Sequence, residues 1–183
     1  MNHKGTVTLE SDRLILRKFK MEDAESVFSN WTSDSEVAKY MRWDAHISVD
    51  ETKDFLADII ESYNNPNTYL WAIVPKDMDI PIGIISLMVS NEYDMCGEVA
   101  YCIGRKYWGN GFMTEALRTV LYYGLREVGF NRIEAYHAIA NPASGKVMLK
   151  AGMKYEGMMR QKYRSHIGFE DCNLYAILKA DIL

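Results

Sequence analysis

The stretch RKYWGNGFMTE, Arg105–Glu115, is the most informative part of the chain because it joins a predicted strand to a long predicted helix. Gly109 and Gly111 stand two residues apart immediately before that helix. Glycines let the backbone come close to a ligand, and the free N–H groups at a helix start attract anions. The stretch therefore predicts a cradle for phosphate groups, although a simple tight turn would account for the two glycines equally well.

Two common phosphate-binding motifs do not fit this chain. The dinucleotide fingerprint Gly-x-Gly-x-x-Gly needs a third glycine where Thr114 stands. A P-loop ending at Gly145 and Lys146 would need glycine in place of Ala140 and a hydroxyl residue in place of Val147. The sequence thus argues against a dinucleotide-dependent enzyme and against a P-loop protein.

Hydrophobic periodicity on either side of this stretch predicts an α+β chain. Three consecutive strands with short connections predict antiparallel hairpins, and a strand–helix–strand order in the second half predicts a crossover. We expect a mixed, mostly antiparallel central sheet of about seven strands with helices on both faces. The predicted strands are Leu14–Phe19, Tyr69–Val74, Ile82–Val89, Gly97–Ile103, Arg132–Ile139, Met153–Arg160 and Asp171–Lys179, and the predicted helices begin near Glu22, after Ser48, at Gly111 (ending at Val128) and after Asn141.

Length and composition describe an ordinary globular protein. The 183 residues are 48% hydrophobic and 25% charged, which argues against fibrous and disordered classes and suits a single domain over residues 1–183. No apolar run approaches the ~18 residues of a membrane span, and the first ten residues lack the apolar core of a signal peptide. We therefore expect a cytoplasmic protein with no membrane partner.

Cysteine and histidine spacing predicts neither a disulfide nor a metal site. The cysteines are odd in number and show no CxxC spacing, which favours reduced thiols. The histidines outside the strands show no ligand spacing, so no metal is expected. The residues concerned are Cys96, Cys102 and Cys172, and His3, His46 and His166.

Charge is distributed unevenly along the chain. The net charge of −4 argues against a nucleic-acid partner. Between Trp31 and Tyr63, eight acidic and three basic residues give −5, which leaves +1 for the rest. A negative cleft wall would concentrate cations, but the same acids also suit an ordinary solvated helix face.

The Arg105–Glu115 stretch resembles the acetyl-CoA pyrophosphate arm of the GNAT superfamily, Gln/Arg-x-x-Gly-x-Gly/Ala. Tryptophan in place of Gln/Arg, followed by Thr-Glu-Ala, is typical of its RimJ/RimL-like branch of ribosomal-protein alanine acetyltransferases. Met113 departs from the usual alanine or glycine and would crowd the arm if its side chain faced the phosphate. The arm is Trp108, Gly109, Asn110, Gly111, Phe112 and Met113.

Further landmarks of that branch follow in order and extend the resemblance over about residues 7–180. Each is a stretch of the chain that matches a strand or helix of the family. They are LESDRLILRKFKMEDAE at 9–25, EVAYCI at 98–103, NPASGKVMLKAGMKYEG at 141–157 and DCNLYAIL at 171–178.

The resemblance implies acetyl-CoA as cosubstrate. Residues 108–113 and Thr114 would hold its pyrophosphate, and the backbone of Ile103 would meet pantetheine. Asn141 occupies the family's CoA-contacting place, although asparagine before proline is also simply a good helix cap. Arg105 and Lys106 would add contacts to phosphate or remain solvated.

The resemblance also implies direct transfer of the acetyl group to an amine. Glu98 is the candidate base, because burial in an apolar strand would raise its pKa; a structural carboxylate paired with a neighbouring strand or arginine is the alternative, and a water chain could also serve. Ser144 is the candidate hydrogen-bond donor to the CoA sulfur, or decorates a first helical turn. The tyrosine that many family members use as acid falls at Met148, which cannot donate a proton.

Other candidates are weaker. His137 fits a satisfied core position better than a catalytic one, and Tyr175 has no assigned role. Tyr40, Met41 and Trp43 could line an acceptor cleft.

The expected activity is N-acetylation of a cationic primary amine by a monomer or homodimer. The acceptor would be a peptide or protein N-terminus, with a polyamine or aminoglycoside as runner-up. A non-catalytic acyl-CoA-binding module of the same fold is the main rival, because Met113 and Met148 depart from the family pattern.

Overall fold

The computed structural model describes residues 1–165 and 168–182, so His166 lies outside the described residues. Its centre is one mixed sheet of eight strands in the order β1-β2-β3-β4-β5-β6-β8-β7. The sheet has one strand more than expected, because β1 is a two-residue bridge, too short for a periodic signal. The strands are β1 (Leu9–Glu10), β2 (Leu14–Arg17), β3 (Leu70–Pro75), β4 (Gly83–Asn91), β5 (Cys96–Ile103), β6 (Arg132–Ala138), β7 (Lys154–Ser165) and β8 (Gly168–Leu178).

The strand directions follow the connections. Strands β3 to β5 run antiparallel through short turns, as the hairpin prediction requires. β2 also pairs antiparallel with β3, but the long connection between them contains α1, α2 and α3. β5 and β6 are parallel, because α4 carries the chain across the sheet between them. β6, β8 and β7 then pair antiparallel. The predicted crossover in the second half is confirmed.

Two predicted helices differ in detail from the structure. The first breaks into a 3₁₀ turn, α1 and a π-helical turn, Phe28–Thr32. The helix expected to reach Val128 ends its α-helical part at Tyr123 and continues as a π-helical turn to Gly129, whose φ is 95°. The α-helices are α1 (Ala24–Val27), α2 (Ser35–Ala38), α3 (Val49–Ser62), α4 (Phe112–Tyr123) and α5 (Pro142–Lys150). In the part of the chain that is described, none of them has the length and apolar character to cross a membrane.

The start of α3 shows how local sequence sets a boundary. Ser48 precedes the helix, and its Oγ accepts the N–H of Glu51 at 3.3 Å. The Glu51 carboxylate in turn accepts the N–H of Ile47 at 2.9 Å. These bonds satisfy N–H groups that a helix start leaves without partners.

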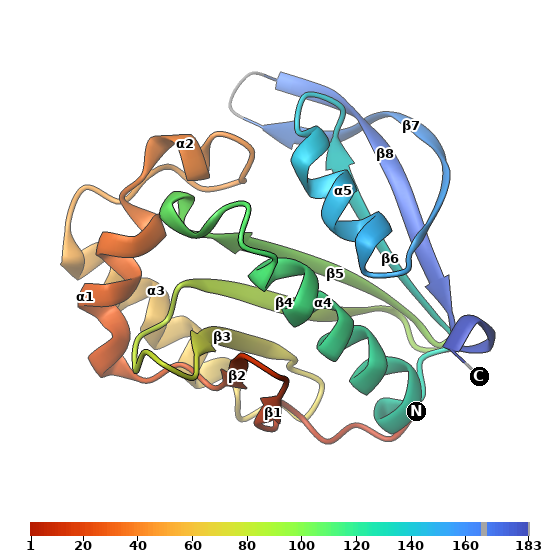
Figure 1. Cartoon of the computed structure of the whole chain (residues 1–183), viewed down its shortest axis with the longest axis horizontal. Coiled ribbons are helices and arrows are strands. Elements are labelled where there is room, and N and C mark those ends of the chain that lie inside the picture. The colour runs from red at the N-terminus through yellow and green to blue at the C-terminus, as the bar shows by residue number, and fades with distance from the viewer. Residues whose placement is uncertain (166–167, 183) are drawn as a thin grey trace.

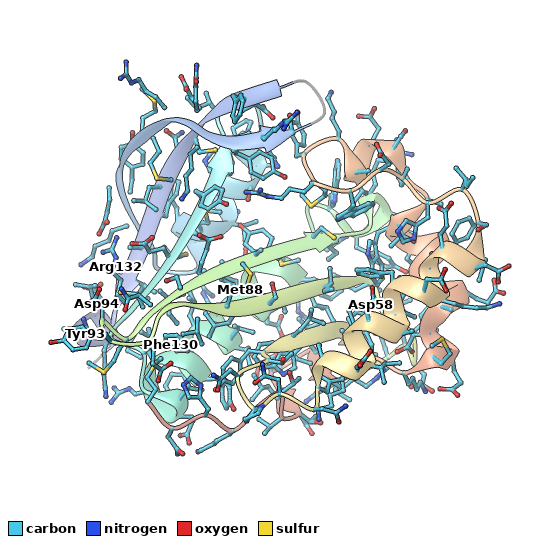
Figure 2. All side chains as sticks on the ribbon, turned by 180° about the vertical axis from the view of Figure 1, so that it is seen from behind. Asp58, Met88, Tyr93, Asp94, Phe130 and Arg132 are labelled. Carbon is cyan, nitrogen blue, oxygen red and sulfur yellow. The ribbon has the colours of Figure 1, made fainter. Side chains whose placement is uncertain are left out.

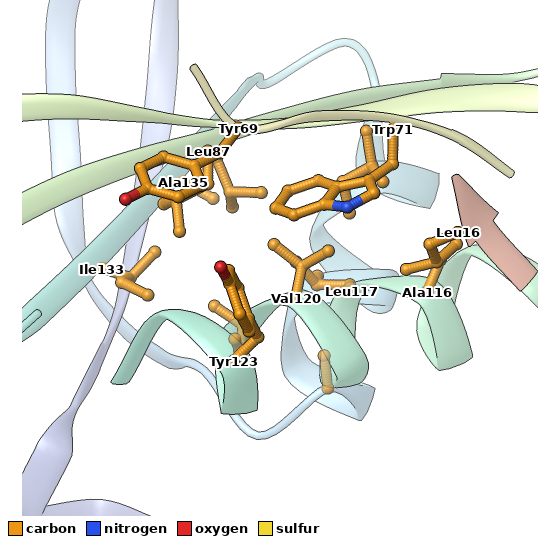
Figure 3. Close-up of a cluster of buried hydrophobic side chains, with 14 of the residues drawn as sticks. Leu16, Tyr69, Trp71, Leu87, Ala116, Leu117, Val120, Tyr123, Ile133 and Ala135 are labelled. Atoms are coloured by element: carbon orange, nitrogen blue, oxygen red, sulfur yellow. The ribbon is translucent and has the colours of Figure 1, made fainter. Parts of the chain in front are cut away.

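Helices cover both faces of the sheet. α4 and α5 lie in front of it in Figure 1, whereas α3, marked by Asp58 in Figure 2, crosses the opposite face. Beneath α4 lies the larger core, in which the rings of Trp71 and Tyr123 meet edge to face at 5.9 Å (Figure 3). A second core under α1 and α3 contains Trp31 and Leu56. Because each such side chain contributes roughly 1.5–3 kcal/mol when fully buried, the two cores fix the helices to the sheet.

β5 and β6 pair only where they meet, along Cys96–Glu98 and Arg132–Glu134. Both strands continue beyond that point, and Figure 1 shows them separating like the arms of a V. β5 stays paired with β4 on its other edge, so the alternation of the ladder directs the peptide groups of Val99, Tyr101 and Ile103 towards the opening. The opening between β5 and β6 is therefore lined by backbone N–H and C=O groups of β5 that make no bonds within the sheet.

Candidate functional site

A cavity of about 530 Å³ occupies the opening between β5 and β6. Its walls come from these strands, from β4, β7 and α5, and from the connection between α2 and α3. Several lining residues are ones that the sequence analysis singled out: Tyr40, Met41, Trp43, Glu98, Asn141 and Ser144. Others were assigned no role there or were placed in the core: Arg42, Tyr101, Tyr136, His137 and Tyr163.

Glu98 is the one carboxylate among the lining residues that the structure describes. Burial raises the pKa of Glu98 above its ordinary value, and the nearby charge of Glu134 adds to the rise. Lys162, a hydrogen bond from Tyr136 and the charge of Arg42 oppose it. A carboxyl group with a raised pKa is better matched to accepting a proton from an ammonium.

The structural alternative for Glu98 finds little support in the contacts around it. The arginine of the neighbouring strand, Arg132, pairs with Glu134 at 2.6 Å and with Glu156. Glu98 is therefore left facing the cavity, near enough to Tyr136 for that hydroxyl to lower its pKa.

Ser144 lies on the first turn of α5 and contacts Tyr101 of β5. The Tyr101 hydroxyl lies 3.0 Å from the Ser144 carbonyl oxygen, to which it donates, and 3.0 Å from the Ser144 Oγ. Burial raises the pKa of Tyr101 far above its ordinary value, so the phenol stays protonated. The sequence analysis expected the backbone near Tyr101–Ile103 to supply the oxyanion donor, but it gave the Tyr101 side chain no role, because an aromatic residue in an alternating strand is usually a packing residue.

Asn141 stands at the start of α5, but its side chain makes no capping hydrogen bond. Asn141 is therefore the N-cap residue by position, as the helix-cap alternative requires, but without a side-chain cap. Pro142 supplies the first helical residue and needs no N–H partner there. The Asn141 side chain lines the cavity instead, where it is available to a ligand.

His137 is buried, as expected for a core residue, but it is not satisfied. Its Nδ1 lies 2.7 Å from the carbonyl of Ala138, which places the proton on Nδ1. Its Nε2 is buried without a partner among the described residues. A β-carbon on Gly145 would lie 2.4 Å from that nitrogen, so only glycine fits there. The ring stacks on Tyr175 at 5.6 Å.

The pyrophosphate arm has the backbone that the sequence predicts. Gly109 and Gly111 adopt φ of 79° and 78°, which favours glycine, and α4 begins directly after Gly111. The first N–H groups of α4 have no intrahelical partner, and residues 109–114 include no acid. These features fit the pyrophosphate of acetyl-CoA.

Two side chains of the arm have positions that the sequence did not reveal. Met113 is 5% exposed and packs into the larger core, so it leaves the phosphate side of the loop uncrowded. The indole N–H of Trp108 donates to the carbonyl of Ile103 at 2.8 Å. The carbonyl of Ile103, which we expected to contact pantetheine, therefore already accepts a hydrogen bond. The backbone N–H of Ile103 remains available to pantetheine.

The cation that hydrogen-bonds to the arm is not one that the sequence suggested. Arg105 pairs with Asp34 at 3.0 Å, and the Lys106 ammonium lies 5.0 Å from the ring centre of Tyr107. Arg13 instead donates to the carbonyl of Asn110 at 3.1 Å.

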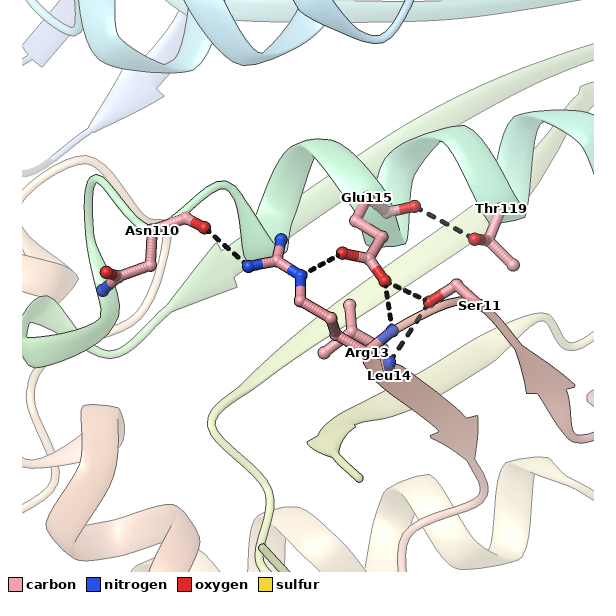
Figure 4. A network of polar contacts seen from close by, with 6 residues as sticks. All are labelled: Ser11, Arg13, Leu14, Asn110, Glu115 and Thr119. Atoms are coloured by element: carbon pink, nitrogen blue, oxygen red, sulfur yellow. Dashed lines mark hydrogen bonds and ion pairs between the residues drawn. The ribbon is translucent and has the colours of Figure 1, made fainter. Parts of the chain in front are cut away.

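Arg13 and Glu115 connect the turn between β1 and β2 to the first turn of α4 (Figure 4). The Glu115 carboxylate accepts the backbone N–H and the Nε of Arg13 and the Oγ of Ser11, each at 2.7 Å. Burial, the largest single influence, acts to raise the pKa of Glu115, but these hydrogen bonds together lower it. The contacts hold the arm against the sheet.

A Glu115→Gln substitution should destabilise the fold by ~1–2 kcal/mol, because charge-assisted hydrogen bonds are replaced by weaker ones. Because the folded-state pKa is lowered, the carboxylate stabilises the fold above its unfolded pKa, and this contribution is lost as pH falls through the folded value. Urea unfolding at neutral and acid pH measures both effects. Glu127→Gln, at an exposed carboxylate paired with Lys4, is the control, and an equal loss in both variants would contradict the prediction.

The acidic segment predicted to steer the acceptor lies outside the cavity. None of its eight acids is among the lining residues, whereas its Arg42 is. Asp34 pairs with Arg105, and Asp50 pairs with Lys53 at 2.8 Å. Any attraction of cations by this segment would have to act at long range, where salt screens it.

The described residues form no cluster of metal ligands and no disulfide. Within residues 1–165 and 168–182, no group of three or more side chains could hold a metal ion. The cysteines Cys96, Cys102 and Cys172 are unpaired, and burial raises the pKa of the Cys102 thiol to about 12.

Comparison with known proteins agrees with this geometry. Residues 13–154 match a family model described as an acetyltransferase (GNAT) domain. An uncharacterized N-acetyltransferase of Bacillus subtilis, YoaA, is 32% identical over 171 residues, or 93% of this chain and 96% of that protein. The ribosomal protein uS5-alanine N-acetyltransferase of Escherichia coli is 25% identical over 172 residues, or 88% of each protein.

A solved structure extends the likeness to the fold. A GNAT-family acetyltransferase from Bacillus anthracis superposes with a TM-score of 0.83 at 28% identity, over 95% of this chain and 99% of that chain. The expected fold and enzyme class are thereby confirmed. With its diverging β5 and β6 and its glycine arm before α4, this chain belongs to the GNAT family of acetyl-CoA-dependent N-acetyltransferases.

Proposed function

We propose that the protein transfers the acetyl group of acetyl-CoA directly to the primary amine of a peptide or protein N-terminus, with both substrates bound together. The observation that carries the proposal is that Glu98 and Ser144 line one cavity together with the exposed backbone of β5. That backbone leads directly into the pyrophosphate arm. Acceptor and thioester would therefore share one space.

Each residue then has a distinct task. Acetyl-CoA supplies the electrophilic carbonyl. Glu98 takes a proton from the acceptor ammonium, which frees the lone pair for attack. A backbone N–H of β5 that faces the opening stabilises negative charge on the carbonyl oxygen.

The departing thiol group needs only modest help. Ser144 donates a hydrogen bond to the sulfur by turning its hydroxyl proton away from the oxygen of the neutral Tyr101 phenol, which lies 3.0 Å from the Ser144 Oγ. A thiolate has a pKa of ~8.5, so a weak donor is sufficient. Met148, also in the cavity wall, contributes no proton.

The choice of acceptor rests on charge and on one relative. An ammonium is attracted to the carboxylate of Glu98, and a protein N-terminus is the acceptor class that the name of the uS5-alanine relative indicates for that protein. The cytoplasm is the proposed compartment, because unpaired thiols persist there. Polyamines and aminoglycosides are the competing cationic acceptors.

The test has two stages. Thermal shift with acetyl-CoA and with NAD should show stabilisation by acetyl-CoA alone. Thiol release is then followed with a panel of N-terminal peptides, polyamines and aminoglycosides at low and high ionic strength. Binding of acetyl-CoA without thiol release on any amine would leave a non-catalytic acyl-CoA-binding module in place of an enzyme.

A further inference from the structure

Two cations stand at the acceptor side of the cavity, and both rest on tyrosine rings. The guanidinium carbon of Arg42 lies 4.7 Å from the ring centre of Tyr163, and its Nη2 donates to the Tyr136 hydroxyl at 3.4 Å. The Lys162 ammonium lies 5.4 Å from the ring centre of Tyr136. The tyrosines line the cavity together with Arg42. The cations are therefore held beside the space that receives the acceptor.

The position of Arg42 is fixed by contacts between distant segments. The Tyr163 hydroxyl donates to the carbonyl of Tyr40 at 2.9 Å, which ties the connection after α2 to β7. The Tyr40 hydroxyl donates to the carbonyl of Ala140 at 3.2 Å. The rings of Tyr136 and Tyr163 meet edge to face at 6.3 Å. The guanidinium is thus held by contacts between residues of the protein itself.

Neither cation is neutralised within the described residues. Arg42 and Lys162 form no ion pair there, and both act on Glu98 only through space, lowering its pKa. Two further carboxylates lie in this region. Glu170 lies opposite Tyr163 in the β7–β8 pairing, and its Oε1 is buried without a hydrogen-bond partner among the described residues. The Asp171 Oδ1 accepts the backbone N–H of Gln161 at 2.8 Å. Arg42 in the cavity wall and the exposed Lys162 beside it therefore place two positive charges near the space that would receive the acceptor ammonium.

We propose that the acceptor carries an anionic group, a carboxylate or a phosphate, close to its reactive amine, and that Arg42 and Lys162 bind this group while Glu98 receives the ammonium. Guanidinium groups are well suited to such anions because they present several N–H donors in one plane. The inference rests on the proposed function and narrows it to N-termini that have an acidic or phosphorylated residue next to the first residue. It disfavours polyamines and aminoglycosides, which bring further positive charge against Arg42 and Lys162.

Amidated tetrapeptides that differ only at the second position test the inference. The peptides are Ala-Asp-Ala-Ala, Ala-Asn-Ala-Ala, Ala-Lys-Ala-Ala and Ala-phosphoserine-Ala-Ala. We expect kcat/KM for the aspartate peptide to exceed that for the asparagine peptide about tenfold at low salt, with the lysine peptide poorest. A still higher value for the phosphoserine peptide would identify phosphate as the preferred anion. The advantage should shrink in high salt.

Variants assign the effect to the two cations. Arg42→Gln should lower the aspartate-to-asparagine ratio severalfold, and Arg42→Gln combined with Lys162→Gln should bring it close to one. Lys150→Gln, at an exposed cation on α5 outside the cavity, should leave the ratio unchanged. Acetyl-CoA affinity and circular dichroism verify that each variant is folded.

The outcomes separate the two proposals. Equal rates for the aspartate and asparagine peptides, or a ratio that survives in the double variant, would overturn the anion site while leaving the acetyltransferase activity intact. Acetyl-CoA binding without acetylation of any peptide or amine would overturn the proposed function and the anion site with it.

Discussion

A Gly111→Val variant should lose acetyl-CoA binding and remain folded. Gly111 has a φ of 78°, a conformation that a β-branched residue adopts only at a cost of ~1–2 kcal/mol. The substitution leaves room for the fold, because the new β-carbon would meet only the end of the Arg13 side chain, at 3.5 Å. It would, however, reshape the loop whose N–H groups point at the pyrophosphate. We expect affinity to fall at least ~100-fold, or about 2.7 kcal/mol, by calorimetry.

The other end of the same helical segment supplies a matched control. Gly129 has a φ of 95°, and a β-carbon there would meet nothing within 4 Å. Gly129→Val therefore imposes comparable backbone strain without touching the arm. It should lower the thermal midpoint about as much as Gly111→Val and leave acetyl-CoA affinity unchanged. Equal affinities in the folded Gly111 variant and the wild type would remove the arm from the cofactor site.

Sequence predicted the elements of this fold well where they are periodic or punctuated. The apolar faces of α3 and α4 and the glycines around the arm depend only on neighbouring residues. Each can therefore be recognised from a short stretch of sequence. β1 was not predicted because two residues are too few to show a hydrophobic period. The extra length of β7 and β8 escaped because their pairing includes irregularities around Gly157 and between Met159 and Tyr163, which break the alternation.

The site was predictable only in part, for a related reason. Glu98 and Ser144 were singled out by residue type and position, and both line the cavity. Tyr101 and His137 were overlooked or assigned to packing, because their spacing is that of core residues. What distinguishes them is tertiary: the divergence of β5 from β6 exposes one side of each strand. In the sequence, Arg42 is one of three basic residues in an acidic segment. In the structure Arg42 lines the cavity, whereas the acids of that segment do not.

Glu98→Gln should reduce kcat about 100-fold at neutral pH, the usual range for loss of a general base, with little change in the KM for acetyl-CoA. The amide keeps the shape of the side chain but cannot accept the proton. The deficit should shrink as pH rises, because the α-amino group, with an ordinary pKa of ~8, is then already neutral. Initial rates of thiol release between pH 6 and 9.5 measure both effects.

The wild-type profile carries a second signature. Because burial raises the pKa of Glu98, its deprotonated form appears at higher pH than for an ordinary glutamate, and activity rises with it. Glu134→Gln removes a negative charge opposite Glu98 in the strand register and should therefore lower the pKa of Glu98. The rise of activity with pH should then begin at lower pH, and activity should not be abolished. The same substitution also frees Arg132 from one partner, so its unfolding midpoint must be measured alongside.

Stability distinguishes a catalytic Glu98 from a structural one. A carboxyl whose folded pKa is raised favours folding only while protonated, and that contribution is lost as pH rises through the folded value. At pH 7 the buried charge therefore costs stability, and Glu98→Gln should unfold at the same temperature as the wild type or higher. A fully active variant, or one whose unfolding temperature drops while activity falls in proportion to the folded fraction, would make Glu98 a structural carboxylate and place the base elsewhere.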